Sequence, residues 1–342
     1  MSLESALSQQ PHKGGACGWL LSYNNARFLP AAVAGVLAQH APLRLLFSDN
    51  QSQDGALDVL KQLAAESERE IAVQTGPGTG VAGHMNACMA RTSEAHIVVF
   101  HDDDVSYPQR AGRLLERLQR GSAVVGSRFR PVNAEGAPVT DCSGHAQTEW
   151  GHRHLARGQE IFVFGCSMGF HRRVFDDFGP IPVEAWQEDI VIGFRGALLD
   201  RVEQLPEVLL DRRLTGHNAS HFAPSSAALS FEQRLHAKIA LHRRQVAGVL
   251  ASHRTDLARA QALGHVGAAL ARRIQRRLID YYQHMLDLGD AVAADDPRAI
   301  RRALRPLLGH WHSRRWAMAW LLRAWLGPGP RLDRLLGRWF GC

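Results

Sequence analysis

The chain has 342 residues, of which 45% are apolar and 21% are charged. This length and composition suit one large folded domain with an added region, and they exclude a chain that is disordered throughout. The five cysteines are scattered without paired short spacings, which predicts a reducing compartment and no zinc site. The sequence shows neither a long uncharged apolar stretch nor a basic segment leading into an apolar one, so we expect no spanning helix, no signal peptide and a cytoplasmic protein.

Charge is divided unevenly along the chain. The region 231–342 has 20 Lys and Arg residues against 8 Asp and Glu residues, whereas residues 1–230 have 20 against 25. A basic excess favours an anionic partner, such as membrane headgroups, nucleic acid or a phosphate-bearing substrate. Because the basic region contains no recognisable nucleic-acid-binding motif, we expect no nucleic acid partner.

The first half of the chain alternates apolar runs with helix-forming segments. Strands are predicted at 17–23, 43–48, 71–75, 95–100 and 122–129, and helices at 27–39, 54–68, 80–92 and 108–120. Strands separated by helices of this length form a mainly parallel sheet with helices on both faces. Further along, the sequence predicts a strand, a turn and a helix over 160–179, a helix over 185–200, a strand-like segment over 201–220, and arginine-rich helices near 231–263, 265–290 and 297–309.

Polar residues follow three of the predicted strands. These are SYNN at 22–25, SDN at 48–50 and HDDD at 101–104. The carboxyl ends of parallel strands meet at one edge of a sheet, where ligands bind. Asn and Asp also suit turns and helix caps, but an aspartate triplet exceeds what capping requires. Adjacent carboxylates repel one another, so any that are buried must be paired or bound to a cation.

Six segments resemble those of the family 2 glycosyltransferases, which are inverting enzymes with the GT-A fold. In order, they are LLSYNNARFLPAAVAGVLAQ, FSDNQSQDGALDVL, GVAGHMNACMARTSEAHIVVFHDDD, FGCSMGFHRRVF, WQEDIVIGFR and RRLTGHNAS. Each segment alone is a weak signal, but six in the right order on the predicted strand ends are specific. The resemblance implies a Rossmann-like GT-A domain over 16–230, with a mostly parallel sheet flanked by helices. A flexible segment, 1–15, precedes it, and a basic, Trp- and Arg-rich helical extension, 231–342, follows.

The same resemblance implies an activity. We expect a hexosyl- or N-acetylhexosaminyltransferase that moves a sugar from a nucleotide-diphosphate sugar, with a UDP-sugar favoured, to a glycan or lipid-linked glycan in surface polysaccharide or glycoconjugate biosynthesis. One alternative is a nucleotidyltransfer enzyme of related fold, which normally has a glycine-rich loop with Arg and Lys after the first strand, where this chain has SYNNARF. The other is a non-catalytic protein that binds nucleotide-sugars or anionic surfaces, and the intact acidic pairs argue against it.

In the resembling family, an Asp-x-Asp at a strand end holds a divalent cation against the donor diphosphate. Hard carboxylate oxygens favour Mg²⁺ or Mn²⁺. By this register Asp104 is the direct ligand, and Asp102 reaches the ribose or, through water, the metal. Asp103 takes the variable middle position on the donor side, and its substitution is expected to be mild. The histidine that some relatives use as a further ligand is replaced by Thr215, which leaves His217 as the candidate.

The donor site also follows from the resemblance. Asp49 is expected to accept a hydrogen bond from a uracil-like imide N–H, and Ser22, Tyr23 and Asn24 are expected to line the base and ribose. Asn86 is expected near the nucleoside and diphosphate because its amide both donates and accepts hydrogen bonds. Alternatively, Asn86 is an ordinary residue of a helix surface.

Inversion by direct displacement needs a base that removes the proton of the acceptor hydroxyl. The family's Glu-Asp pair corresponds to Glu188 and Asp189, and we assign Asp189 as the base. Glu188 then positions the acceptor or exchanges roles with Asp189. The alternative is that both acids only complement the positive end of a helix dipole.

The end of the chain is rich in tryptophan and arginine. Five of the eight tryptophans lie in the last 32 residues, at 311, 316, 320, 325 and 339, interleaved with arginines. Indole rings and guanidinium groups together suit a membrane interface, so we expect peripheral contact with the cytoplasmic face of a membrane. A helix that docks on the enzyme or in an oligomer is the alternative.

Overall fold

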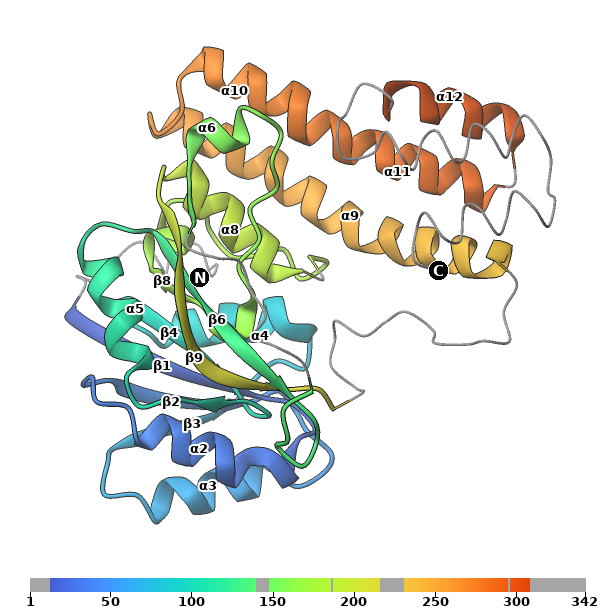
Figure 1. Ribbon diagram of the computed structural model, residues 1–342. Helices are drawn as coiled ribbons and strands as arrows, with labels where there is room; N and C mark the ends of the chain where they lie inside the picture. Colours follow the sequence, from blue (N-terminus) through green and yellow to red (C-terminus); the bar gives the residue numbers. More distant parts are fainter. Residues whose placement is uncertain (1–12, 140–147, 186, 216–230, 295, 308–342) are drawn as a thin grey trace.

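The computed structural model describes residues 13–139, 148–185, 187–215, 231–294 and 296–307 (Figure 1). The strands in these ranges are β1 (Lys13–Ser22), β2 (Arg44–Asp49), β3 (Ile71–Thr75), β4 (Glu94–His101), β5 (Val105–Ser106), β6 (Val124–Val132), β7 (Thr148–Trp150), β8 (Gly169–His171) and β9 (Val202–Arg213). The helices are η1 (Ala26–Phe28), α2 (Leu29–Leu37), α3 (Ala56–Ala65), α4 (Gly80–Ala90), α5 (Arg110–Gln119), α6 (His152–Leu155), η2 (Gly165–Ser167), α7 (Arg173–Asp176), α8 (Glu188–Leu198), α9 (Phe231–Ala262), α10 (Ala268–Ile274), the π-helical η3 (Gln275–Ile279), α11 (Asp280–Ala293) and α12 (Pro297–Leu307).

The strands form one mixed sheet in the order β3-β2-β1-β4-β8-β6-β9-β5, with β7 paired to β9. Strands β3, β2, β1 and β4 run parallel, and β8 is antiparallel to both of its neighbours. Successive side chains of a strand point to opposite faces, and in β1 both faces are buried, with Trp19 on one side and Leu20 on the other. A strand buried on both faces requires helices on both. The predicted sheet with helices on either side is therefore confirmed.

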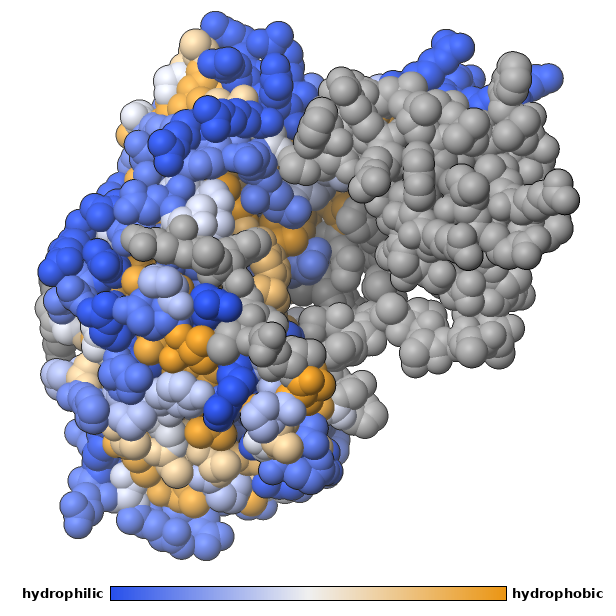
Figure 2. All heavy atoms as spheres, in the orientation of Figure 1, coloured by the Kyte–Doolittle hydropathy of each residue, from blue (hydrophilic) through white to orange (hydrophobic). Residues whose placement is uncertain are grey.

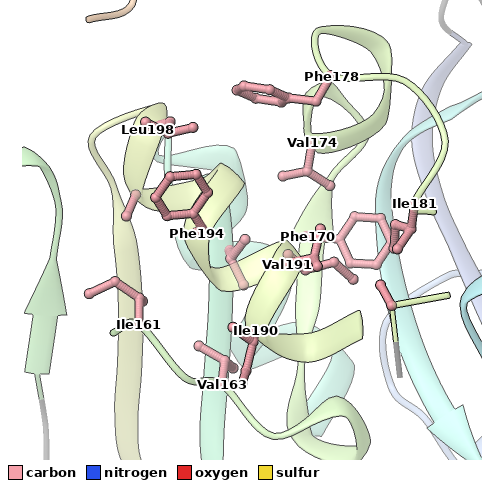
Figure 3. Packing of buried hydrophobic residues seen from close by; sticks show 14 of the residues in the cluster. Ile161, Val163, Phe170, Val174, Phe178, Ile181, Ile190, Val191, Phe194 and Leu198 are labelled. Atoms are coloured by element: carbon pink, nitrogen blue, oxygen red, sulfur yellow. The ribbon is translucent and has the colours of Figure 1, made fainter. Parts of the chain in front are cut away.

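Two hydrophobic clusters fill the space between the sheet and its helices. Helices α2, α3 and α5 cover one face, where their apolar side chains pack against Leu20, Phe47 and Phe100. Helices α4, α7 and α8 cover the other face, and part of this second cluster is shown in Figure 3. The second cluster extends without a break into α9, α10, η3 and α11.

The C-terminal helices are therefore not packed as a separate unit. Val249 and Leu250 of α9 and Tyr282 of α11 belong to the same buried cluster as Phe194 of α8. Helix α12 in turn packs on α11 through a small cluster of its own. The boundary predicted at residue 230 thus separates two parts of the chain that share one hydrophobic core.

One predicted strand is wrong. The segment 160–164 forms no strand, and the strand of this region, β8, comes after the turn at η2 instead. Ile161 and Val163 do point into the core, and they alternate with half-buried and exposed neighbours as the residues of an extended segment do. However, their segment lies against a helix, α8, so that a Cβ placed on Gly193 would be only 2.4 Å from the carbonyl oxygen of Ile161. Alternation indicates an extended, half-buried segment, but a strand also needs a neighbouring strand with which to pair.

Across the ranges given above, the helices are all too short or too polar to cross a bilayer. The five tryptophans at 311–339 lie outside the residues that the structure describes, so the predicted membrane contact of that segment stays a prediction. The free cysteines Cys17, Cys88 and Cys166 are buried.

Candidate functional site

The ends of β2, β1 and β4 lie side by side, which brings the predicted polar residues together. In the register of the sheet, Ser22 is opposite Asp49 and Leu21 is opposite His101. Ser22 and Asp49 are both buried. One carboxylate oxygen of Asp49, Oδ2, accepts the backbone N–H of Ser52 at 3.0 Å. The other, Oδ1, is buried without a hydrogen-bond partner among the described residues. An unpaired buried acceptor costs about 1–3 kcal/mol, so this oxygen is suited to a donor that arrives with a ligand.

The loop after β1 is held by Asp102. The backbone N–H of Tyr23 donates to Asp102 Oδ2 at 2.7 Å, and Asn25 Nδ2 donates to Asp102 Oδ1 at 2.9 Å. Asn24 adopts a left-handed conformation with φ of 54°, and its Oδ1 accepts the backbone N–H of Gln53. The side chain of Tyr23 is 58% exposed. Both oxygens of Asp102 therefore face the loop in which Tyr23 and Asn24 were predicted to line the base and ribose.

A second group forms beside this loop. Ligand atoms of His101, Asp103 and Asp104 all lie within 4.8 Å of one another. Asp104 Oδ1 accepts the backbone N–H of Arg213 at 2.9 Å, which ties the end of β9 to the aspartates. Burial, together with the charge of Asp103, raises the pKa of Asp104 well above its usual value. Burial likewise raises the pKa of Asp102 to about 7 and lowers that of His101 to about 4.

The structure thus places the triplet differently from the sequence register, which paired Asp102 with Asp104 and set Asp103 aside. Asp103 lies with Asp104 and His101, and Asp102 is not a member of this group. The sequence argument assumed an extended chain, in which alternate residues share a side. The chain instead turns at residues 102 and 103, so that alternation does not apply.

The histidine near the aspartates differs from the histidine predicted as a metal ligand. His101 was not among the predicted ligands, although its place directly before the triplet was a signal that could have found it. His217, which was among them, lies outside the described residues.

The two predicted acceptor-side acids occupy the first turn of α8. A Cβ placed on Gly165 would lie 3.1 Å from Glu188 Oε1 and 3.8 Å from His101 Nε2, so the acids of α8 and the group at the end of β4 approach each other at this glycine. Burial raises the pKa of Glu188 well above its usual value and that of Asp189 to about 7. An acid that only complements a helix dipole would have its pKa lowered. For Glu188 and Asp189, the increase in pKa caused by burial outweighs the decrease that the helix dipole would cause.

Helix α4 carries Asn86, which was predicted to lie beside the donor, and His84. Asn86 Nδ2 donates to the carbonyl oxygen of Ile181 at 2.7 Å, and Asn86 Oδ1 accepts the N–H of the same residue at 2.9 Å. The amide therefore ties α4 to the segment before α8, and its predicted place beside the donor stays a prediction. His84 is buried with Nε2 2.6 Å from Ser48 Oγ. Burial lowers its pKa to about 4, which keeps the imidazole neutral.

Comparison with known proteins finds similarity to glycosyltransferases. Residues 20–179 match the sequence model of glycosyl transferase family 2. Over 272 residues the chain is 26% identical to an uncharacterized glycosyltransferase of Nostoc sp. (strain PCC 7120), and the match covers 77% of this chain and 81% of that protein. The glycosyltransferase identity expected from the sequence is thereby supported.

Solved structures of similar fold include TarS 1–349 of S. aureus. Its complex with UDP has a TM-score of 0.51 at 11% identity, covering 84% of this chain and 90% of that one. Its complex with UDP-GlcNAc has a TM-score of 0.50 at 14% identity, and the match covers 89% of this chain and 88% of that one. At these identities the likeness concerns the fold alone, and it confirms the predicted GT-A architecture.

Proposed function

We propose that the protein transfers a sugar, with inversion, from a nucleotide-diphosphate sugar to a hydroxyl of a glycan or lipid-linked glycan in surface polysaccharide or glycoconjugate biosynthesis. A UDP-sugar is the favoured donor, in keeping with the UDP and UDP-GlcNAc complexes of TarS. One observation carries the proposal: His101 and Glu188 both lie next to the Cβ position of Gly165. Groups suited to a diphosphate and to an acceptor proton therefore share one edge of the sheet.

The nucleoside would bind at the ends of β1 and β2. Asp49 Oδ1 is a buried acceptor without a partner among the described residues, and a uracil imide N–H would supply the missing donor. Ser22, Tyr23 and Asn24 would line the base and ribose. Asp102 fixes their loop through two hydrogen bonds, which suits it to a positioning role on the donor side.

A divalent cation, Mn²⁺ or Mg²⁺, would be held by His101, Asp103 and Asp104. These residues fit such an ion because two buried carboxylates stand beside a histidine whose low pKa keeps it neutral, as metal ligation requires. Burial raises the pKa of Asp104, and the negative charge of Asp103 raises it further; a bound cation would offset this second effect. When bound, the ion would neutralise charge on the departing diphosphate.

Asp189 is the proposed base. The acceptor oxygen attacks the anomeric carbon as the bond from this carbon to the diphosphate oxygen breaks, and the acceptor proton passes to the Asp189 carboxylate. A pKa raised by burial makes this carboxylate a stronger base than an exposed aspartate. Glu188, its neighbour in the first turn of α8, would position the acceptor.

Peripheral membrane contact through the C-terminal region, on the cytoplasmic face, is part of the proposal. On α12, Arg298, Arg301, Arg302 and Arg305 are exposed while Ile300 and Leu304 pack inward, so one helix face is basic. The part of α12 visible in Figure 2 is hydrophilic. Such a face suits anionic headgroups. At low salt, the protein should sediment together with phosphatidylglycerol vesicles. If an equal fraction of the protein sediments with phosphatidylcholine vesicles, the proposed contact with anionic headgroups is wrong.

A thermal-shift panel of nucleotide-sugars, with and without Mn²⁺, tests the donor site. We expect one donor to raise the Tm only with the metal, and Asp104→Asn to remove that rise. Asp58→Asn, an exposed aspartate on α3, is the matched control. Asp189→Asn should keep the donor-induced rise and lose sugar transfer. If no nucleotide-sugar stabilises the wild-type protein in a metal-dependent way, the proposed function is wrong.

A further inference from the structure

The segment 160–164 has two different sides. Ile161 and Val163 are buried, and Figure 3 shows them beside Ile190 and Phe194 of α8. The alternate residues Glu160, Phe162 and Phe164 are exposed or half-buried. This segment leads directly into Gly165, whose Cβ position lies 3.1 Å from Glu188 Oε1, so its end lies next to the acids at the start of α8.

The outer side carries an aromatic pair. The rings of Phe162 and Phe164 meet edge to face with centroids 4.6 Å apart, and Phe164 in turn meets the ring of Phe129 at 4.9 Å. The guanidinium carbon of Arg212 lies 5.6 Å from the centre of the Phe164 ring. The packing holds Phe164 from the protein side, while its remaining exposed part offers an apolar surface for a ligand.

Glu160 adds a carboxylate that the C-terminal helices hold in place. The hydroxyl of Tyr282, on α11, donates a hydrogen bond to Glu160 Oε1. Tyr282 is itself buried and meets the ring of His253 of α9 edge to face. Glu160 is exposed but close enough to Asp189 for its negative charge to contribute to the raised pKa of that residue. A fixed, exposed carboxylate therefore stands near the proposed base.

We propose that Glu160, Phe162 and Phe164 form a subsite for a sugar ring of the acceptor, and that Tyr282 is a positioning residue for Glu160. A sugar ring has an apolar C–H face and an edge of hydroxyl groups, which match an aromatic surface and a carboxylate acceptor, respectively. The proposal rests on the proposed function, because it places this ring beside the base of the same transfer reaction. It also assigns the C-terminal helices a part in recognising the acceptor.

The test uses the full chain and simple glycosides as probes. Methyl glycosides of glucose, galactose, mannose and N-acetylglucosamine, and the disaccharides cellobiose, lactose and chitobiose, are titrated in the presence of UDP and Mn²⁺ and followed by saturation-transfer NMR. We expect at least one probe to bind the wild-type protein. Phe164→Ala and Glu160→Gln should each weaken this binding about tenfold, and Tyr282→Phe should weaken it about threefold, while UDP affinity stays within about twofold. Glu66→Gln, at an exposed glutamate directly after α3, is the control and should change neither affinity.

The outcomes separate this subsite from the proposed function. If the wild-type protein binds UDP but none of the seven probes, or if the three variants bind the probes as tightly as the wild type does, the subsite is wrong while the donor site stands. If UDP affinity falls together with probe affinity in the Glu160→Gln and Tyr282→Phe variants, these residues support the fold or the donor site, and the subsite is again wrong. If no nucleotide or nucleotide-sugar binds at all, the proposed function itself fails.

Discussion

Arg195 and Asp256 form a buried ion pair between α8 and α9, with 2.9 Å between Arg195 Nε and Asp256 Oδ2. Arg195 also donates to the carbonyl oxygens of Val174 and Gly179, and Asp256 accepts a further bond from the hydroxyl of Ser252. Each side chain is only 1% exposed. Helix α8, which begins with the two proposed acceptor-side acids, is therefore held to α9 by a buried ion pair in which each charge lies next to the opposite charge.

Removal of Asp256 should destabilise the whole protein. In Asp256→Ala, the buried guanidinium of Arg195 would lose its only carboxylate partner among the described ion pairs, and such a loss costs about 3–5 kcal/mol. We expect urea denaturation at pH 7 to show this fall in the free energy of unfolding. Asp287→Ala, at an exposed site on α11, should change it by less than about 0.5 kcal/mol. A fall of less than about 1 kcal/mol for Asp256→Ala would mean that the pair does not hold the helices together.

Substitutions in the triplet should follow the structure and not the sequence register. Asp103→Asn and Asp104→Asn should each lower the Mn²⁺-dependent part of UDP binding at least about tenfold, because both lie in the proposed ligand group. Asp102→Asn should instead weaken UDP binding equally with and without Mn²⁺, since Asp102 holds the loop after β1. Isothermal titration of UDP at several Mn²⁺ concentrations distinguishes the two effects. A mild Asp103→Asn beside a severe Asp104→Asn would restore the register predicted from the sequence.

The unpaired oxygen of Asp49 predicts the effect of its amide. In Asp49→Asn the side-chain oxygen can still accept the N–H of Ser52, but the negative acceptor for a base N–H is lost. A hydrogen bond to a charged group contributes about 1.5–3 kcal/mol, so UDP should bind about 10- to 100-fold more weakly. Calorimetry of UDP binding measures this, with Asp58→Asn as the matched control. Unchanged affinity would remove Asp49 from the base site.

Transfer should depend on pH through Asp189. The base acts only when deprotonated, and burial raises its pKa to about 7. We therefore expect kcat at saturating donor to fall about tenfold for each pH unit below 7 and to level off above it. A kcat that stays constant from pH 8 down to pH 5 would argue against Asp189 as the base.

The same pKa has a consequence for stability. Folding raises the pKa of Asp189 above its unfolded value of about 4, so its contribution to stability is fully present below that value and is lost as the pH rises through about 7. Asp189→Asn cannot ionise and avoids this loss. The variant should therefore melt at a higher temperature than the wild type at pH 8 and at a similar temperature at pH 4. A lower Tm at pH 8 would show that the carboxylate is stabilised in the fold by its surroundings.

Much of the fold could be predicted from local patterns. The strand predicted at 71–75 matches β3, and the helices of the first half begin and end within a few residues of the predicted bounds. These elements follow from periodicity and from turn residues, which are properties of neighbouring positions. The polar strand ends were likewise visible, because a parallel sheet brings its carboxyl ends together whatever the detailed packing.

The order of residues alone predicts the α/β succession of elements, the acidic residues at the strand ends and, through six ordered segments, a resemblance to one family. Long-range packing brings Asp103 and His101 to Asp104, lays 160–164 along a helix, and makes α9 and α11 share the core of α8. Each of these depends on contacts between distant positions, such as the bond from the Arg213 amide to Asp104 across 109 residues. Periodicity records which side of an element is buried. It does not record which distant element covers that side, and here the covering elements set the geometry of the site.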